Sequence, residues 1–225
     1  MNSIVSCLRN LAPWFACVLV VGVISFLITR PDAPSRKGDP SDITGMLPTT
    51  LILRPDSPAR GRGNTFTLVE FADFQCSSCK KAQPVLQDLL AQHADLRLVF
   101  RHCPLTLVHP FADKAARAAE IARLKGKFWE MHDALFRRQA EWQEATDIRD
   151  ALCDVAAGIG LDRRWFAHRL DMADGAENVN SDSRAAGDCS VMTTPSFFLI
   201  TPTRVWTAVG PTALERLRDN EKYWQ

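Results

Sequence analysis

Two cysteines three positions apart, Cys76 and Cys79, are the residues of this sequence best suited to chemistry. A thiolate is the reacting form of cysteine, and a helix N-terminus favours it because unpaired backbone N–H groups carry partial positive charge there. The three-residue step brings the second sulfur back within one helical turn, near enough to close a disulfide. The pair therefore predicts reversible disulfide chemistry, with Cys76 as the attacking sulfur and Cys79 as the resolving sulfur.

The elements that must position these cysteines are predicted from the apolar pattern. Residues 65–73 are dense in Phe, Leu and Val and predict a strand, and a helix follows from about 76 to 93. Residues 96–101 alternate as a second strand. A strand, a helix and a strand at this spacing form a parallel βαβ unit. Pro84 lies inside the predicted helix and is expected to kink it.

Two carboxylates precede the cysteines. Glu70 lies on an otherwise apolar strand, six residues before Cys76. A buried carboxyl group there is a candidate proton acceptor for Cys79, through water if needed. The alternative is an ordinary exposed strand position. Asp73 is interpreted as a turn or helix-capping residue.

A second motif, Thr194-Pro195, leads into a Phe-rich strand. Proline is confined in sheets to strand starts, edges and bulges. A cis Thr194–Pro195 bond would expose a backbone edge beside the thiols, where a substrate chain can pair. A trans proline that only begins the strand is the alternative.

A helical block separates two sheet-forming parts of the chain. The fold class predicted is therefore α/β, with a helical domain inserted into the sheet domain. The block is predicted as helices over residues 111–125, 128–139, 148–158, 163–170 and 177–187, with Asp162 as an N-cap, followed by strands over 196–200 and 204–209 and a helix over 214–223.

The N-terminus is interpreted as a membrane anchor. Residues 11–28 are apolar almost throughout, which is just long enough to cross a hydrocarbon core of roughly 30 Å. No small-x-small cleavage site follows, so an uncleaved anchor over residues 1–30 is predicted, with a cleaved signal peptide as the alternative. Residues 31–63 are rich in Pro, Asp, Ser, Gly and Arg and predict a flexible linker, of which residues 51–53 are expected to add a short edge strand to the domain.

The remaining cysteines leave several pairings open. Cys153 and Cys189 are candidates for a structural disulfide in an oxidising compartment. Pairing of either one with Cys103 and inert buried thiols are the alternatives. Zinc needs a compact set of Cys and His ligands, and no second Cys-x-x-Cys is present, so neither a metal nor another cofactor is predicted. The formal net charge of +1 gives no basic field, so no nucleic-acid partner is predicted.

Together these features resemble the thioredoxin superfamily, and within it the DsbA-like thiol–disulfide oxidoreductases. The resemblance covers residues from about Thr65 to the C-terminus. It is carried by the segment from Glu70 to Cys79, by Pro84, by Thr194-Pro195, by residues 100–105, by His109-Pro110 and by residues 126–136.

The resemblance implies a thioredoxin fold with a helical insertion, a cis Pro195, Glu70 as the buried acid and work outside the cytoplasm. The implied parts are residues 64–106 as the first half of the fold, 107–188 as the insert and 189–225 as the second half. Three departures leave the redox direction open. Ser77-Ser78 replaces Pro-His between the cysteines and predicts a milder oxidant, Cys103 stands where the family has a large apolar residue, and Thr193 replaces a common Gly.

The function predicted is a membrane-tethered thiol–disulfide oxidoreductase in the periplasm or otherwise outside the cytoplasm. Cys76 and Cys79 exchange their disulfide with reduced secreted or envelope proteins, Glu70 handles protons, and Thr194-Pro195 binds the substrate backbone. The expected direction is oxidation, with a membrane redox partner that reoxidises the pair. A reductase or isomerase of the same fold is one alternative. A tethered, non-enzymatic module that binds a client protein or copper is the other.

Overall fold

The computed structural model describes residues 38–225. Their elements, in chain order, are β1 Ser41–Asp42, α3 Thr49–Ile52, β2 Ala59–Arg60, β3 Phe66–Ala72, α4 Ser77–Gln92, β4 Leu96–His102, α5 Ala112–Arg123, α6 Phe128–Arg137, α7 Gln139–Gln143, α8 Ile148–Gly158, α9 Arg163–Asp171, α10 Ala176–Asp188, β5 Ser196–Ile200, β6 Val205–Val209, α11 Gly210–Arg218 and the 3₁₀ helix η1 Glu221–Trp224.

Six strands form one mixed sheet in the order β1-β6-β5-β3-β4-β2. The central strands β3 and β4 are parallel, with Glu70 beside Phe100, and β5 and β6 add to β3 as an antiparallel hairpin. Strand β3 is buried over nearly its whole length, which explains why its sequence is apolar on both faces apart from Thr67 and Glu70. The predicted βαβ unit, the two predicted strands after the helical block and the α/β class are confirmed.

Three apolar cores hold the helices to the sheet. One lies between the sheet and α4 and α11, and includes Leu68, Leu86 and Leu214. A second, on the opposite face, includes Phe71 and Phe198 and is covered by residues of α3 and α10. The third fills the block of α5 to α9 and reaches Cys76 and Cys79. The cysteines therefore lie where the sheet domain meets the helical block.

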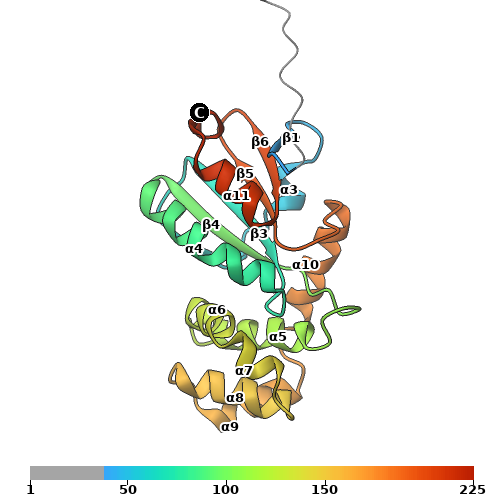
Figure 1. Cartoon of the computed structure of the whole chain (residues 1–225). Coiled ribbons are helices and arrows are strands. Elements are labelled where there is room, and N and C mark those ends of the chain that lie inside the picture. Colours follow the sequence, from blue (N-terminus) through green and yellow to red (C-terminus); the bar gives the residue numbers. More distant parts are fainter. Residues whose placement is uncertain (1–37) are drawn as a thin grey trace, which may run out of the picture. The chain divides into compact units, whose positions relative to one another are not determined.

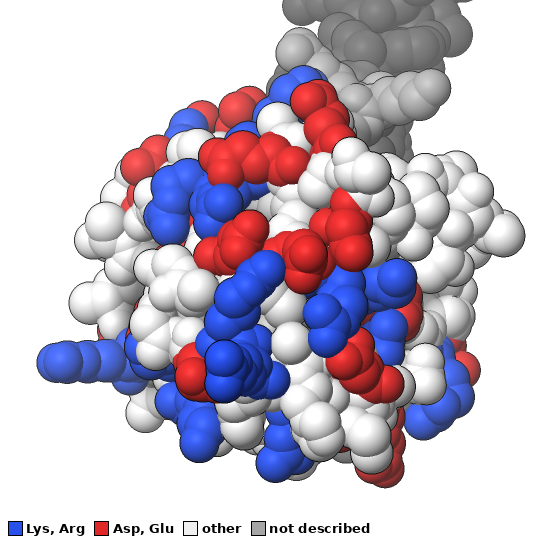
Figure 2. Space-filling view, turned by 90° about the horizontal axis from the view of Figure 1, so that it is seen from below, with Lys and Arg blue, Asp and Glu red and all other residues white. Residues whose placement is uncertain are grey.

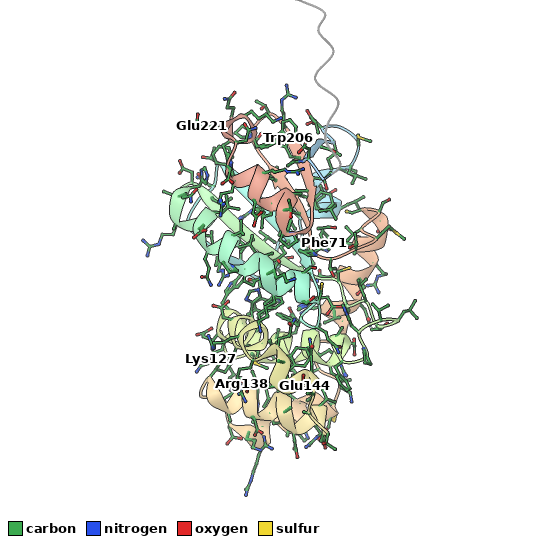
Figure 3. The ribbon with its side chains drawn as sticks, in the orientation of Figure 1. Phe71, Lys127, Arg138, Glu144, Trp206 and Glu221 are labelled. Atoms are coloured by element: carbon green, nitrogen blue, oxygen red, sulfur yellow. The ribbon has the colours of Figure 1, made fainter. Side chains whose placement is uncertain are left out.

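The helical block is inserted between β4 and β5, below the sheet in Figure 1. Figure 3 shows Phe71 on the sheet, and Lys127, Arg138 and Glu144 on the block. The predicted helices are confirmed with small shifts at their ends. Asp162 caps α9, as predicted, because its side chain accepts a hydrogen bond from the Trp165 N–H group. The face seen from below in Figure 2 carries interleaved acidic and basic side chains, with no field of one sign.

The linker prediction is wrong for residues 38–63, which belong to the folded domain. Strand β1 pairs with β6, and β2 pairs with β4, so each covers one edge of the sheet. Residues 51–53 form no strand, because Leu51 and Ile52 belong to the single turn of α3, where Ile52 is buried. The segment ends in a close contact: a Cβ atom on Gly63 would lie 1.8 Å from the carbonyl carbon of Asp95, so only glycine fits.

The predicted C-terminal helix is wrong at both ends. Helix α11 begins at Gly210, with Pro211 in its first turn, where a missing N–H group costs nothing. It ends at Arg218, and a separate turn, η1, follows. The predicted anchor over residues 1–30 lies outside the described residues. Within residues 38–225, no helix has both the length and the apolar character needed to span a membrane.

Candidate active site

Cys76 occupies the N-cap position of α4, directly after the turn that leaves β3. Only 9% of it is exposed. Its Sγ atom lies 3.4 Å from the carbonyl oxygen of Thr194, to which the thiol donates a hydrogen bond. The Thr194–Pro195 peptide bond is cis, as the resemblance implies. The structure therefore brings together the two motifs that the sequence places 118 residues apart.

The pKa values of the two thiols are shifted in opposite directions. A hydrogen bond from Cys79 lowers the pKa of Cys76 to about 5, and the backbone N–H groups of Ser78 and Cys79 add to the effect against the cost of burial. Burial raises the pKa of Cys79 well above its usual value, and its hydrogen bond to Cys76 raises it further. One sulfur is thus prepared as a thiolate at neutral pH and the other as a thiol, which fits the predicted attacking and resolving positions.

Glu70 is fully buried beside this pair. Burial raises the pKa of its carboxyl group to about 8. The amide Nε2 of Gln83 lies 3.3 Å from Glu70 Oε1 and 3.1 Å from the carbonyl oxygen of Cys79, so one side chain contacts both residues. The exposed alternative for Glu70 is wrong. A carboxyl group with this pKa exchanges its proton near neutral pH, as a proton acceptor and donor must.

Asp73 makes more hydrogen bonds than its predicted role as a turn or helix-capping residue requires. Its Oδ1 atom accepts a hydrogen bond from the Gln75 N–H group at 2.7 Å. Its Oδ2 atom accepts one from the Leu105 N–H group at 2.9 Å and one from His109 Nδ1 at 2.7 Å. Asp73 is buried, so these contacts satisfy a carboxylate that water does not reach. They hold the loop after β4 against the turn that carries Cys76.

Helix α7 also holds the turn that carries Cys76, through contacts that the sequence did not predict. Gln139 Nε2 donates to the carbonyl oxygens of Phe74 at 2.8 Å and Cys76 at 3.0 Å. Gln143 Nε2 donates to the carbonyl oxygen of Gln75 at 2.8 Å. Three successive carbonyl groups are therefore fixed by the inserted block. A glutamine at an intermediate helical position carries no signal of such a contact, because its partners are backbone atoms far away in the sequence.

The predicted disulfide between Cys153 and Cys189 is not formed. Both are free thiols, as is Cys103. Cys153 lies in the core of the helical block, whereas Cys103 and Cys189 lie in the core between the sheet and α10. Two cysteines in separate cores cannot reach the short Cβ–Cβ distance that a disulfide needs. Burial raises the pKa of all three thiols, so they are far less reactive than Cys76 at neutral pH.

Two buried histidines, His102 and His132, each contact a carboxylate. His102 Nε2 lies 3.0 Å from Glu120 Oε1, and His132 Nδ1 lies 2.7 Å from Asp133 Oδ1. Burial lowers the pKa of His132 to about 4, so its ring is neutral. Among residues 38–225, no three His, Cys, Asp or Glu side chains are arranged to hold a metal ion.

The acidity of Cys76 gives a first prediction. Alkylation of the reduced full chain at Cys76 is expected to rise with pH through about 5 and to be constant near neutrality, because only the thiolate reacts. Mass spectrometry of iodoacetamide-treated protein across pH 3–9 measures this profile. The same chain in denaturant is the control, with its midpoint expected at about 8.5. A midpoint of the folded chain near that of the denatured chain would contradict the prediction.

Comparison with known proteins is consistent with this geometry. Residues 56–217 match the family model described as Thioredoxin. The chain belongs to the thioredoxin family. The matched residues include every predicted site residue, from Glu70 to Pro195, and both halves of the sheet. The match begins within the segment that the sequence suggested as a linker.

Solved structures with the same fold include oxidoreductases. A thioredoxin-like oxidoreductase from Silicibacter pomeroyi DSS-3 is 26% identical, and the alignment covers 76% of this chain and 98% of that one with a TM-score of 0.59. The thiol-disulfide exchange protein alpha-DsbA2 from Wolbachia pipientis is 23% identical, with 79% and 91% covered and a TM-score of 0.61. The fold is therefore DsbA-like, as the sequence resemblance implies.

Curated relatives include much longer proteins. The Na(+)/H(+) antiporter NhaA 3 of Salinispora tropica is 43% identical over 157 residues, which make up 69% of this chain and 23% of the antiporter. The chain thus spans less than a quarter of that relative. The likeness concerns a thioredoxin-like part of the antiporter sequence, and the ion transport in its name is a property of that whole protein.

Proposed function

We propose that this protein is a thiol–disulfide oxidoreductase that oxidises the cysteines of secreted or envelope proteins. The observation that carries the proposal is the acidic Cys76 thiol, which the resolving Cys79 stabilises at the N-terminus of α4 and which lies 3.4 Å from the Thr194 carbonyl oxygen. A thiolate stabilised in the dithiol form makes the corresponding disulfide a stronger oxidant. This favours the oxidase over the reductase or isomerase, even with Ser77 and Ser78 between the sulfurs.

The chemical step follows from the two acidities. A substrate thiolate attacks Sγ of Cys76 in the disulfide form, and the Cys76–Cys79 bond breaks as the mixed disulfide forms. Cys79 leaves with the electron pair and takes up a proton, because its pKa is well above neutrality. A second substrate thiolate then attacks the substrate sulfur of the mixed disulfide. Cys76 leaves as a thiolate, and the substrate carries the new disulfide.

Glu70 supplies and removes the proton of Cys79. With a pKa of about 8 it is mostly protonated at neutral pH, so it can give a proton to the leaving thiolate. Gln83 contacts the Glu70 carboxyl group and the backbone carbonyl oxygen of Cys79, and it also lines a surface pocket of about 280 Å³ together with Lys80 and Asp133. Water in that pocket provides the route by which Glu70 recovers its proton.

The site of action proposed is the outer face of a membrane, with residues 1–30 as the anchor. The support is the apolar sequence of residues 11–28 and the chemistry of the pair, since dithiols oxidise and persist as disulfides outside the cytoplasm. The partners implied are reduced secreted proteins and a membrane redox protein that restores the Cys76–Cys79 disulfide.

A transfer experiment tests the function and its direction. The oxidised full chain is expected to introduce a disulfide into a reduced, unfolded test protein and to emerge as the dithiol. In cells quenched with acid, alkylation with a maleimide after return to neutral pH is expected to find the Cys76–Cys79 pair mostly oxidised. A mostly reduced pair in the cell would assign the reductase or isomerase role. The absence of any thiol exchange would refute the oxidoreductase.

A further inference from the structure

Arg60 lies on the same face of the sheet as Glu70, although the two come from different strands. Arg60 of β2 is paired with Leu98 of β4, and Glu70 of β3 is paired with Phe100 of the same strand. Side chains two residues apart on a strand point to one face, and paired residues of neighbouring strands share that face. The register therefore directs the Arg60 and Glu70 side chains to one face, with Leu98 and Phe100 between them.

Helix α6 of the helical block holds the Arg60 side chain in place. The guanidinium carbon of Arg60 lies 4.4 Å from the centre of the Trp129 ring, and its Nη1 atom lies 3.0 and 3.2 Å from the two carboxylate oxygens of Asp133. Trp129 also donates a hydrogen bond from Nε1 to the carbonyl oxygen of Ala59 at 2.9 Å. Trp129 and Asp133 are four residues apart, so they lie on one face of the helix. One face of α6 thus binds both residues of β2.

The positive charge of Arg60 is only partly matched by Asp133. Asp133 contacts Nη1 alone, whereas Nε and Nη2 of Arg60 are buried and have no hydrogen-bond partner within residues 38–225. Glu70 Oε2 is likewise buried without a partner in that part of the chain. A guanidinium stays protonated at every pH at which the protein works. A constant positive charge with unused donors therefore shares a sheet face with a carboxyl group that has an unused acceptor.

This charge opposes the effect of burial on Glu70. Burial raises the pKa of Glu70 to about 8, and the charge of Arg60 is the strongest of the influences that lower it. The other charged or titratable side chains around Glu70 and Arg60 are Cys76, Cys79 and Lys80 at the start of α4, His102 of β4, and His132, Asp133 and Arg137 of α6. His132 is neutral, because burial lowers its pKa to about 4. Lys80 and Arg137 line the surface pocket, where water screens them.

We propose that Arg60 is a positioning residue for the proton transfer of Cys79, and that its guanidinium, held by α6, favours the carboxylate form of Glu70. The proposal rests on the proposed function and adds a residue to its proton transfer. When the disulfide re-forms, Cys79 must give up its proton, and only the carboxylate form of Glu70 can accept it. Asp133 acts in the opposite sense, because it neutralises part of the charge that reaches Glu70. The helical block and the edge strand together then set the pH range of this step.

A titration of the Glu70 carboxyl group tests the proposal directly. In the reduced full chain with ¹³C-carboxyl glutamate, the Glu70 signal, assigned by its loss in Glu70→Gln, is expected to titrate at about 8. Arg60→Met is expected to raise this midpoint by about one pH unit, the low end of the effect of an opposite charge. Asp133→Asn is expected to lower it. The two partners of one ion pair thus give opposite shifts, whereas a general loosening of the site would move both midpoints the same way.

Two further variants serve as controls. Arg60→Lys keeps the charge and is expected to keep the midpoint of the unaltered chain. Arg97→Met also removes a positive charge, but Arg97 lines a pocket beside α3, on the opposite face of the sheet. It is expected to leave the midpoint of Glu70 in place.

The rate at which the disulfide closes gives a second readout. A thionitrobenzoate group is placed on Cys76 in a mixed disulfide. Cys79 then attacks Cys76 Sγ, the Cys76–Cys79 bond forms, thionitrobenzoate leaves with the electron pair, and the proton of Cys79 passes to Glu70. In Arg60→Met the release is expected to be about tenfold slower at pH 7, because the carboxylate fraction falls tenfold for each pH unit that the midpoint rises. Stopped-flow absorbance of the released thiolate measures this rate, and Arg60→Lys is expected to restore it.

Two results would overturn the proposal: a Glu70 midpoint that Arg60→Met leaves unchanged, and midpoints of Arg60→Met and Asp133→Asn that move in the same direction. The titration needs no redox turnover, so it is separate from the proposed function. Loss of all thiol exchange with the midpoint shifts intact would refute the proposed function alone. Normal disulfide transfer with an unmoved midpoint would refute the role of Arg60 alone.

Discussion

The Cys76→Ser variant is expected to lose disulfide transfer down to the uncatalysed background. In Cys79→Ser the Cys76 thiolate can still attack a substrate disulfide, and the reaction is expected to stop at the mixed disulfide. The reason is that the pKa of Cys76 is lowered and that of Cys79 is raised. Cys76 is the thiolate at neutral pH and occupies the helix N-terminus, so it is the sulfur that bonds to substrate. Cys79 is fully buried and serves to release that bond.

Replacement of Cys79 by alanine has a further consequence. The hydrogen bond from Cys79 is the largest contribution to the lowered pKa of Cys76, so Cys79→Ala is expected to raise the pKa of Cys76. Its alkylation profile then moves to higher pH while the covalent complex with substrate accumulates. Non-reducing gels of the variants with a disulfide-bonded test protein, together with the alkylation profile, measure both effects.

Cys103→Ala is the matched control for these variants. Cys103 is also buried, but it lies in the core between the sheet and α10, whereas Cys76 and Cys79 belong to the core of the helical block. It is expected to keep disulfide transfer and to trap no complex. Transfer by Cys76→Ser at the rate of the unaltered chain would refute the assignment of the nucleophile. A trapped complex of Cys76→Ser rather than of Cys79→Ser would reverse the two positions.

The parts of the fold that sequence predicts well are those with long apolar patterns. Strands β3 and β5 are mostly apolar, and helix α8 matches its predicted bounds because Asp147 caps it and Gly158 ends it. Their local signals agree with their final environment. The βαβ unit around Cys76 was predictable for the same reason.

The edges of the sheet could not be predicted in this way. Strands β1 and β2 have two residues each, Ser41–Asp42 and Ala59–Arg60, and so contain no period to detect. They exist because β6 and β4 offer them hydrogen-bonding edges. A short apolar run such as 51–53 is equally compatible with strand and helix, and tertiary contacts of Ile52 decide between them.

The candidate site likewise contains residues that the sequence identifies and residues that only the folded structure identifies. Cys76, Cys79, Glu70 and Pro195 were found because their residue types are unusual where they occur. Gln139, Gln143 and the hydrogen bonds of Asp73 were missed because they act on backbone groups that only the folded chain brings near. Reactive residues can be recognised in the sequence by their types and spacing, whereas the contacts that position them depend on tertiary structure.

A buried ion pair fixes the helix that leads to the Thr194-Pro195 loop. Asp182 on α10 is fully buried, and its Oδ1 atom lies 2.6 Å from Arg101 Nε and 3.2 Å from Arg54 Nη1. Its Oδ2 atom accepts a hydrogen bond from the His102 N–H group at 3.0 Å. Arg101 also donates to the Ile52 carbonyl oxygen at 2.8 Å. One carboxylate thus joins α10 to β4 and to the segment before β2.

Asp182→Ala is expected to destabilise the protein by about 3–5 kcal/mol, because it leaves the buried guanidinium of Arg101 without its counter-charge. Urea denaturation of the full chain measures the change in the free energy of unfolding. The double variant Asp182→Ala with Arg101→Met is expected to recover part of the loss, since no unpaired charge is then buried. A double variant as unstable as the sum of the two single variants would contradict this account.

Asp171→Ala supplies the matched control, because Asp171 pairs with Arg149 at 2.6 Å on the surface, where both side chains are about half exposed. It is expected to lower the free energy of unfolding by less than about 1 kcal/mol.

The two substitutions are also expected to differ in their effect on disulfide transfer. Only six residues separate the end of α10 at Asp188 from Pro195, so loosening α10 also loosens the loop that brings the Thr194 carbonyl to Cys76. Asp182→Ala is therefore expected to slow transfer even under conditions where the protein stays folded, whereas Asp171→Ala leaves transfer unchanged. Equal transfer rates for the two folded variants would show that the ion pair supports the fold without positioning the site.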